Sequence, residues 1–68
     1  MKQLIKLYMV INCIDSIDEL VKSAGLKKRT LYDRFKDPKS IRVYEIAALD
    51  DVLHFSDEDL NKLVRGKF

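Results

Sequence analysis

The stretch over residues 16–36 constrains the fold most, because it contains two helical patterns with almost no room between them. Ser16 followed three residues later by Glu19 is typical of a capping box, which predicts that a helix begins there. Gly25 ends that helix, since glycine most readily adopts the left-handed conformation found after a helix C-terminus. The apolar face of the helix consists of Leu20, Val21 and Ala24.

A second helix is predicted from about Lys28 to Lys36. Leu31 and Phe35 lie four residues apart, which is about one helical turn. Pro38 disfavours helical backbone at the residue before it, so the helix is expected to end there. Only the glycine and its neighbours are left to form the turn between the two helices.

The N-terminal region has a helical pattern with one open alternative. Over residues 2–12 the apolar positions that fit a helical face are Leu4, Ile5, Leu7, Tyr8 and Ile11. Val10, Ile11 and Ile14 are β-branched, so a strand over residues 7–14 is the alternative.

Two more helices are predicted towards the C-terminus. The fourth is marked by Val43, Ile46, Leu49 and Leu53. Its start is open, because Arg42 is a poor N-cap and Ser40 is the alternative. Ser56 and three acidic residues begin a last helix that Gly66 ends and that carries Leu60, Leu63 and Val64. The chain of 68 residues is therefore expected to be a single domain over residues 1–68, an all-α compact bundle of five helices.

Basic charge is concentrated in one segment. Residues 27–42 contain seven of the 13 Lys and Arg residues against only Asp33 and Asp37, a net charge of +5, so the rest of the chain is at −3. Such segregation indicates an anionic partner for this segment. Two short helices joined at a glycine, the second of them cationic, form the helix-turn-helix arrangement, in which the second helix enters the major groove of DNA.

At this point the sequence resembles the Cro and phage-repressor family of helix-turn-helix domains, the XRE family, over about residues 14–64. The motif, about residues 17–36, lies in "SIDELVKSAGLKKRTLYDRFKDP", and "RVYEIAALDDVLHFSDEDL" is similar to the fourth and fifth helices of the family. The resemblance implies a lambda-repressor-like fold, with Phe55 at the joint between the last two helices.

Three positions depart from the pattern of the family. Val21 stands where the family usually has alanine. Arg34 stands at a commonly apolar position, with Phe35 supplying the apolar contact one residue later. Ile17 replaces a glutamine that often contacts phosphate in the family, so backbone amides near Ser16 would have to serve instead.

The chemistry of the exposed face assigns roles to its residues. The expected base contacts, on the helix face opposite Leu31, are Lys28, Arg29, Tyr32 and Asp33. Arg29 can donate two hydrogen bonds to guanine, whereas Asp33 either accepts from a cytosine amine or pairs with Arg29. The expected phosphate contacts are Lys27, Thr30, Arg34, Lys36, Lys39 and Arg42.

The remaining chemically active residues predict no enzyme, metal site or cofactor. Cys13, the only cysteine, is expected to be a small buried residue, and His54 to lie at the end of the fourth helix. The core aromatic residues are expected to be Tyr8, Phe35, Tyr44 and Phe55. The longest apolar run, over residues 7–11, is too short to span a membrane, which predicts a cytoplasmic location in a bacterial or phage-infected cell.

The sequence thus predicts a DNA-binding transcriptional regulator such as a Cro-like repressor. Its expected partner is a palindromic double-stranded operator, bound by a homodimer. The expected dimer surface is the last helix and its tail, through Leu60, Leu63, Val64 and Phe68. The alternative for this surface is that Leu60 and Leu63 are buried in the core of the monomer. The alternative is a protein-interaction module, or an antitoxin component, whose basic helix docks on an acidic protein.

Overall fold

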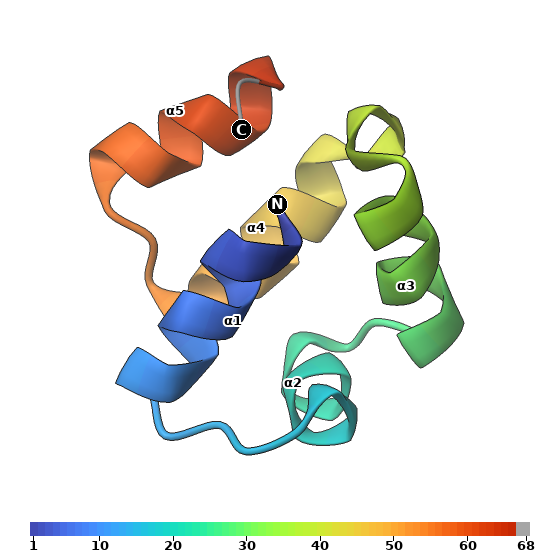
Figure 1. The fold of residues 1–68 in the computed structure, drawn as a ribbon, viewed down its shortest axis with the longest axis vertical. Coiled ribbons are helices and arrows are strands. Elements are labelled where there is room, and N and C mark those ends of the chain that lie inside the picture. The colour runs from blue at the N-terminus through green and yellow to red at the C-terminus, as the bar shows by residue number, and fades with distance from the viewer. Residues whose placement is uncertain (67–68) are drawn as a thin grey trace.

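The computed structural model describes residues 1–66 as five α-helices and one short 3-10 helix (Figure 1). The elements are α1 (Lys2–Ile11), α2 (Ile17–Ala24), α3 (Lys28–Lys36), the 3-10 helix η1 (Pro38–Ser40), α4 (Val43–Leu53) and α5 (Asp57–Arg65). These residues include no strand, so the all-α prediction is confirmed and the alternative of a strand over residues 7–14 is wrong.

The predicted serine caps and glycine ends are present. Ser16 accepts a hydrogen bond from the Glu19 amide at 3.2 Å, and Ser56 accepts one from the Asp59 amide at 3.2 Å. These bonds satisfy amides that a helix leaves free in its first turn. Gly25 and Gly66, with φ of 71° and 69°, end α2 and α5 in the left-handed conformation.

The start of α4 confirms Arg42, the expected N-cap, and rules out Ser40. Arg42 is the N-cap, but the cap hydrogen bond comes from Glu45, whose Oε1 accepts from the Arg42 amide at 2.8 Å. Ser40 does not cap α4; its hydroxyl donates to the Asp37 carbonyl at 2.7 Å, within the turn of η1.

Cys13 is exposed, so the prediction that it is buried is wrong. It follows the C-cap of α1 with φ of 57°, and the Ile14 amide donates to the Met9 carbonyl at 2.8 Å across it. Asn12 ties this end of α1 to α4, because its Nδ2 donates to the Leu53 carbonyl at 2.9 Å. A residue in this left-handed position points its side chain away from the packed face of the helix.

One apolar core joins the helices. Its buried hydrophobic members are Ile5, Tyr8, Met9, Leu20, Val21, Leu31, Ile46, Leu49, Leu53, Phe55 and Leu63. Tyr8 and Phe55 meet edge to face with ring centroids 4.8 Å apart, which confirms both as core residues. The Tyr8 hydroxyl also donates to Asp59 at 2.6 Å and accepts from the Ser56 amide at 3.1 Å, so it joins α1 to the start of α5.

The α1 helix uses a different face for the core than its pattern predicts. Ile5, Tyr8 and Met9 are buried, whereas Leu7 and Ile11, expected on the same face as Tyr8, are 55% and 62% exposed. The buried face is therefore turned towards the Met9 side of the helix.

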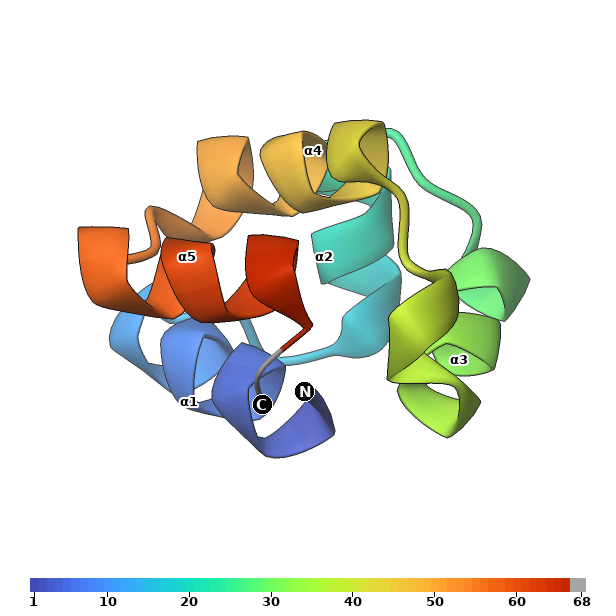
Figure 2. The same cartoon turned by 90° about the horizontal axis from the view of Figure 1, so that it is seen from above.

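The recognition-helix candidate, α3, lies at one end of the molecule. In both Figure 1 and Figure 2 it occupies the opposite side from α5. Figure 2 places α1 and α4 on opposite sides of the bundle, with α2 and α5 between them. The free side of α3 is thus not covered by any other helix.

Candidate nucleic-acid interface

A tight turn connects α2 to α3. The Leu26 amide donates to the Val21 carbonyl at 2.9 Å, and Gly25 between them has φ of 71°. This is the hydrogen bond of a Schellman motif, which requires the left-handed conformation that glycine adopts without a Cβ clash. Three residues, 25–27, separate the two helices, so the turn fixes α3 directly against α2.

Apolar contacts hold one side of α3 and leave the other side free. Leu31 is 1% exposed, and Phe35 is half-buried against the core. On the opposite side the exposed residues are Lys28, Arg29, Tyr32, Asp33 and Lys36. The structure therefore places the four predicted base-contacting residues together on one solvent-facing surface of α3. We call this surface, including Lys36, the α3 face.

Contacts on the α3 face orient two of its side chains. Lys28 Nζ lies 3.0 Å from Asp18 Oδ1, across the turn on α2, and 6.0 Å from the Tyr32 ring centroid. The hydrogen bond and charge of Asp18 raise the pKa of Lys28, so the ammonium stays charged at neutral pH. Tyr32 is 41% exposed and packs edge to face on Phe35 at a centroid distance of 6.0 Å.

Arg29 is left available for a ligand. In the described part of the chain it forms no ion pair, so the alternative in which Asp33 pairs with it is wrong. Arg29 and Asp33 instead present a donor fork and an acceptor pair, four residues apart on the same exposed helix.

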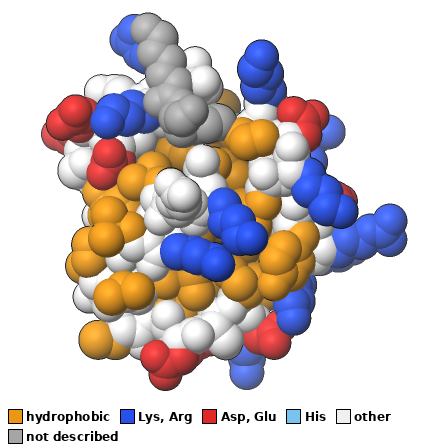
Figure 3. Space-filling model, viewed as in Figure 1, with side chains coloured by type: hydrophobic (Ala, Val, Ile, Leu, Met, Phe, Trp, Pro, Cys, Tyr) orange, Lys and Arg blue, Asp and Glu red, His pale blue; other side chains and the backbone are white. Residues whose placement is uncertain are grey.

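Of the predicted phosphate contacts, Lys36 belongs to the α3 face, and three more lie close to α3 in the chain. Lys27 precedes α3, Lys36 ends it, Lys39 lies in η1 and Arg42 precedes α4, and all four are exposed. In the space-filling view the Lys and Arg side chains gather along the edge where α3 lies (Figure 3). Thr30 is half-buried and lines a hollow of about 310 Å³ together with Gly25, Leu26, Lys27, Tyr44 and Glu45.

Arg34 is placed differently from its prediction as a phosphate contact. Its Nε lies 2.9 Å from Glu45 Oε1, and its side chain is 20% exposed. Its Nη1 also donates to Ser40 Oγ at 3.3 Å. We therefore reassign Arg34 as a residue that fixes α3 to η1 and α4, because its guanidinium is engaged within the protein.

Glu45 is the central residue that the sequence analysis missed. It is 2% exposed and accepts from both Arg34 and the Arg42 amide, while its Oε2 has no partner in residues 1–66. Burial raises the pKa of Glu45, but the hydrogen bonds and charges of Arg34 and Arg42 outweigh it and lower the pKa below its ordinary value. A glutamate at the third position of a helix often caps the helix N-terminus, so the sequence could have predicted the cap of α4. It could not have predicted the pairing of Glu45 with Arg34.

Tyr44 is a second residue missed as part of the interface. It was expected in the core but is 63% exposed, at the rim of the hollow shared with Lys27 and Thr30. It follows the exposed Val43 in the first turn of α4, on the side of the helix away from the buried Glu45 and Ile46. Tyr44 therefore lines the same hollow as Lys27, the residue that precedes α3.

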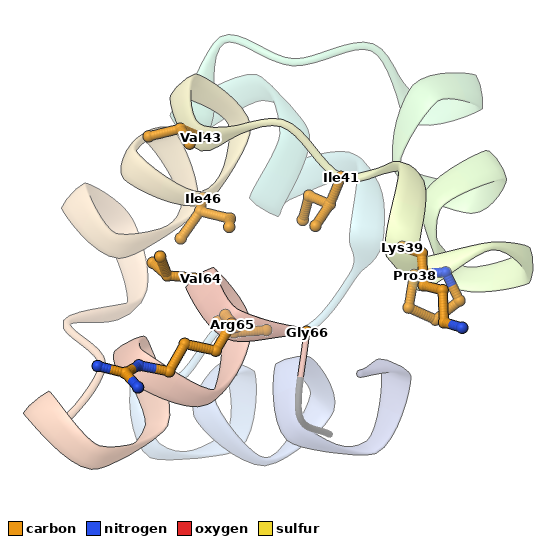
Figure 4. A pocket seen from close by; sticks show the side chains of 9 residues that line it. Pro38, Lys39, Ile41, Val43, Ile46, Val64, Arg65 and Gly66 are labelled. Atoms are coloured by element: carbon orange, nitrogen blue, oxygen red, sulfur yellow. The ribbon is translucent and has the colours of Figure 1, made fainter.

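A separate groove lies between the start of α4 and the end of α5 (Figure 4). Its volume is about 310 Å³, and it is lined by Pro38, Lys39, Ile41, Val43, Ile46, Leu63, Val64, Arg65 and Gly66. This groove touches the predicted dimer surface, of which Val64 is exposed, Leu60 half-buried and Leu63 buried. Phe68 lies outside the described residues.

Residues 1–66 hold no group of three or more His, Cys, Asp and Glu side chains that could bind a metal ion. The acidic residues 57–59 lie in the first turn of α5, where their negative charge stabilises the positive end of the helix dipole. His54 is exposed at the C-cap of α4, as expected from the sequence. Within the same residues no helix is long and apolar enough to cross a membrane.

Comparisons of the chain with protein-family models, with curated protein sequences and with solved structures find no match.

Proposed function

We propose that the protein is a sequence-specific DNA-binding regulator of the helix-turn-helix type, with α3 as the recognition helix. The observation that supports this most is the α3 face: a short helix fixed at a glycine turn, with its free surface cationic and its packed surface apolar. An α-helix of this kind fits the major groove of B-DNA, where base edges can be distinguished.

The proposed roles follow from the chemistry of the side chains. Arg29 reads guanine through two hydrogen bonds, and Asp33 accepts from a cytosine amine. Tyr32 contacts a thymine methyl group with its ring. Lys28 reads a base less specifically, because its ammonium is shared with Asp18 at 3.0 Å.

The cations around the α3 face fix the protein on the DNA backbone. Lys27, Lys36, Lys39 and Arg42 bind phosphates from both sides of the recognition helix. Thr30 and Tyr44 line one hollow together with Lys27 and supply further hydroxyl groups for phosphate. Such contacts set affinity and orientation without reading the base sequence.

The finer functional assignment is a Cro-like repressor of the XRE family that acts in the cytoplasm as a homodimer on a palindromic operator. The competing function is a protein-interaction module or antitoxin component, in which the same basic helix docks on an acidic protein. The +5 charge of residues 27–42 suits both partners, but the alternation of donors, an acceptor and an aromatic ring along α3 favours DNA.

Titration with random duplex DNA at several salt concentrations tests the proposal. Affinity is expected to fall steeply with salt, because each neutralised phosphate releases condensed counterions. Binding that is absent at low salt, or indifferent to salt, contradicts DNA binding and favours the acidic protein partner.

The division between residues that contact bases and residues that contact phosphates is tested on the operator sequence that the protein selects from a pool of random duplexes. Arg29→Ala is expected to relax the preference at one base position, at a cost of roughly 1–3 kcal/mol. Lys39→Ala is expected to weaken binding to every duplex about equally and to reduce the salt dependence. The same effect of both substitutions on all sequences would contradict these roles.

A further inference from the structure

The outer face of α1 exposes three large apolar side chains. Leu7, Val10 and Ile11 are 55%, 76% and 62% exposed, and they lie within about one turn of the same helix. We call them the α1 patch. The other large apolar side chains that the described residues expose are distributed over three helices: Tyr32, Val43, Tyr44 and Val64. Among the described residues α1 thus has the densest exposed apolar surface.

A hollow adjoins the α1 patch. Its volume is about 260 Å³, and it is lined by Lys6, Met9, Val10, Ile14, Asp15, Ser16 and Ile17. Leu7 and Ile11 do not line it: at 100° per residue they lie on the other side of Val10 from Lys6. The surface therefore combines an apolar ridge with an adjacent, largely apolar hollow. In Figure 3 hydrophobic side chains gather on the side of the face away from α3.

The charges around this hollow are self-complementary. Lys6 and Asp15 are its charged lining residues, and neither forms an ion pair within residues 1–66. If two copies meet about a two-fold axis, Lys6 of each copy can face Asp15 of the other. The groove of Figure 4 touches the α5 surface that the sequence predicts for the dimer. Its charged lining residues, Lys39 and Arg65, are both cations and would repel in a self-pairing, so we place the dimer contact on α1 instead.

We propose that a second copy of this chain docks on the α1 patch about a two-fold axis, with the ridge of each copy in the hollow of the other. An isologous contact of this kind closes after two copies and does not propagate into a filament. The α1 patch shares no residue with the α3 face, so the contact itself uses no residue of either recognition surface. The proposal deepens the proposed function by giving the dimer an interface. It rests on the proposed function only in the role it gives the dimer, which is to bind two half-sites of DNA.

The interface is small, so the dimer is expected to be weak. Three side chains and the rim of a hollow fall short of the roughly 800 Å² per partner of a standard interface. We expect a dissociation constant on the order of 10–100 μM in the absence of DNA.

Three exposed valines provide a matched test by sedimentation equilibrium without DNA. Val10 lies on the α1 patch, whereas Val43 and Val64, 73% and 56% exposed, line the groove of Figure 4. Each is replaced by aspartate, and circular dichroism and thermal melting confirm the fold. The wild type is expected to dimerise between about 5 μM and 1 mM, and Val10→Asp to weaken this at least about tenfold. Val43→Asp and Val64→Asp are expected to dimerise as the wild type does.

Three results would overturn the proposal: a wild type that stays monomeric over this range, a Val10→Asp variant that dimerises normally, or an equal loss in Val64→Asp. Because DNA is absent, none of them bears on the DNA-binding function. A charge swap then tests the orientation of the two copies. Lys6→Asp and Asp15→Lys are each expected to weaken the dimer, and the double variant to recover most of the loss. A double variant as weak as the two losses combined would refute the two-fold arrangement.

Discussion

Arg34 and Glu45 form an ion pair that is largely withdrawn from solvent. Their side chains are 20% and 2% exposed, whereas every other ion pair in residues 1–66 involves a lysine whose side chain is 49% exposed. Exposed ion pairs contribute little to the free energy of unfolding. Removing one partner of a buried pair lowers it strongly, because the other charge is left buried without a partner. The pair therefore determines how firmly the end of α3 is attached to α4.

Glu45→Gln is expected to lower the free energy of unfolding by about 2–4 kcal/mol at neutral pH. The amide keeps the shape of the side chain but removes the charge that Arg34 and the Arg42 amide stabilise. Urea unfolding measures the change. Asp18→Asn, which removes the exposed pair with Lys28, is the matched control and is expected to leave the unfolding curve almost unchanged. Equal effects would show that burial of the pair is unimportant.

The same variant predicts a pH dependence. The pKa of Glu45 is lowered in the folded state, so the unfolded state binds a proton at higher pH than the folded state does. This stabilisation is complete above the ordinary glutamate pKa of about 4.3 and is lost as the pH falls through the lowered folded pKa. The difference between wild type and Glu45→Gln is therefore expected to narrow below about pH 4. A constant difference from pH 7 to pH 3 would contradict it.

The sequence could not predict contacts between residues that lie far apart in the chain. Arg34 was identified as a departure from the family pattern, but its partner lies 11 residues away on another helix. Tyr44 and Cys13 were expected to be buried because their types are often found in cores. Cys13 lies in a left-handed turn after α1, and Tyr44 lies on the exposed side of the first turn of α4; neither placement follows from the residue type.

At the scale of the elements, local chemistry predicts the helix ends well. Ser16, Gly25, Ser56 and Gly66 act within one turn of their own helices, so their roles were readable from the sequence and are confirmed. The orientation of α1 was not readable, because it carries apolar residues around most of its circumference. Tertiary contacts of Tyr8 with Phe55 and Asp59 accompany the burial of Ile5 and Met9, and the α1 patch is left outside.

The turn between α2 and α3 predicts a backbone effect at Gly25. A Cβ at this position meets nothing within 4 Å, so Gly25→Ala costs only the left-handed backbone strain, about 1–2 kcal/mol. Gly66→Ala is the matched control, with φ of 69° and equally open space, but it lies at the end of α5 where the helix can fray. Urea unfolding is expected to show the larger loss for Gly25→Ala. A larger loss for Gly66→Ala would contradict a dominant role of the α2–α3 turn.

At the scale of the whole molecule, cationic and apolar surfaces are separated. The α3 face and its surrounding cations lie at one end of the bundle, while the α1 patch belongs to a helix on another side (Figures 1 and 2). The two surfaces therefore share no residue, as the proposed binding of DNA and of a second copy requires. The charge segregation was visible in the sequence, whereas the apolar surface appeared only once the helices were packed.

The last prediction concerns the complex on a palindromic operator. Half-sites one helical turn apart place two recognition helices about 34 Å from each other. The chain supplies one recognition helix, α3, so the two helices must belong to two molecules. The wild type is therefore expected to bind as two copies per operator, measured by mass of the complex, and cooperatively in titration. Val10→Asp is expected to bind a single half-site as the wild type does but to lose cooperativity on the full operator, at a cost of about tenfold or more in affinity. Val64→Asp, which adds the same charge, is expected to remain cooperative. If the wild-type complex contained one protein per duplex and protected a single half-site, the domain would act alone and the prediction would be wrong.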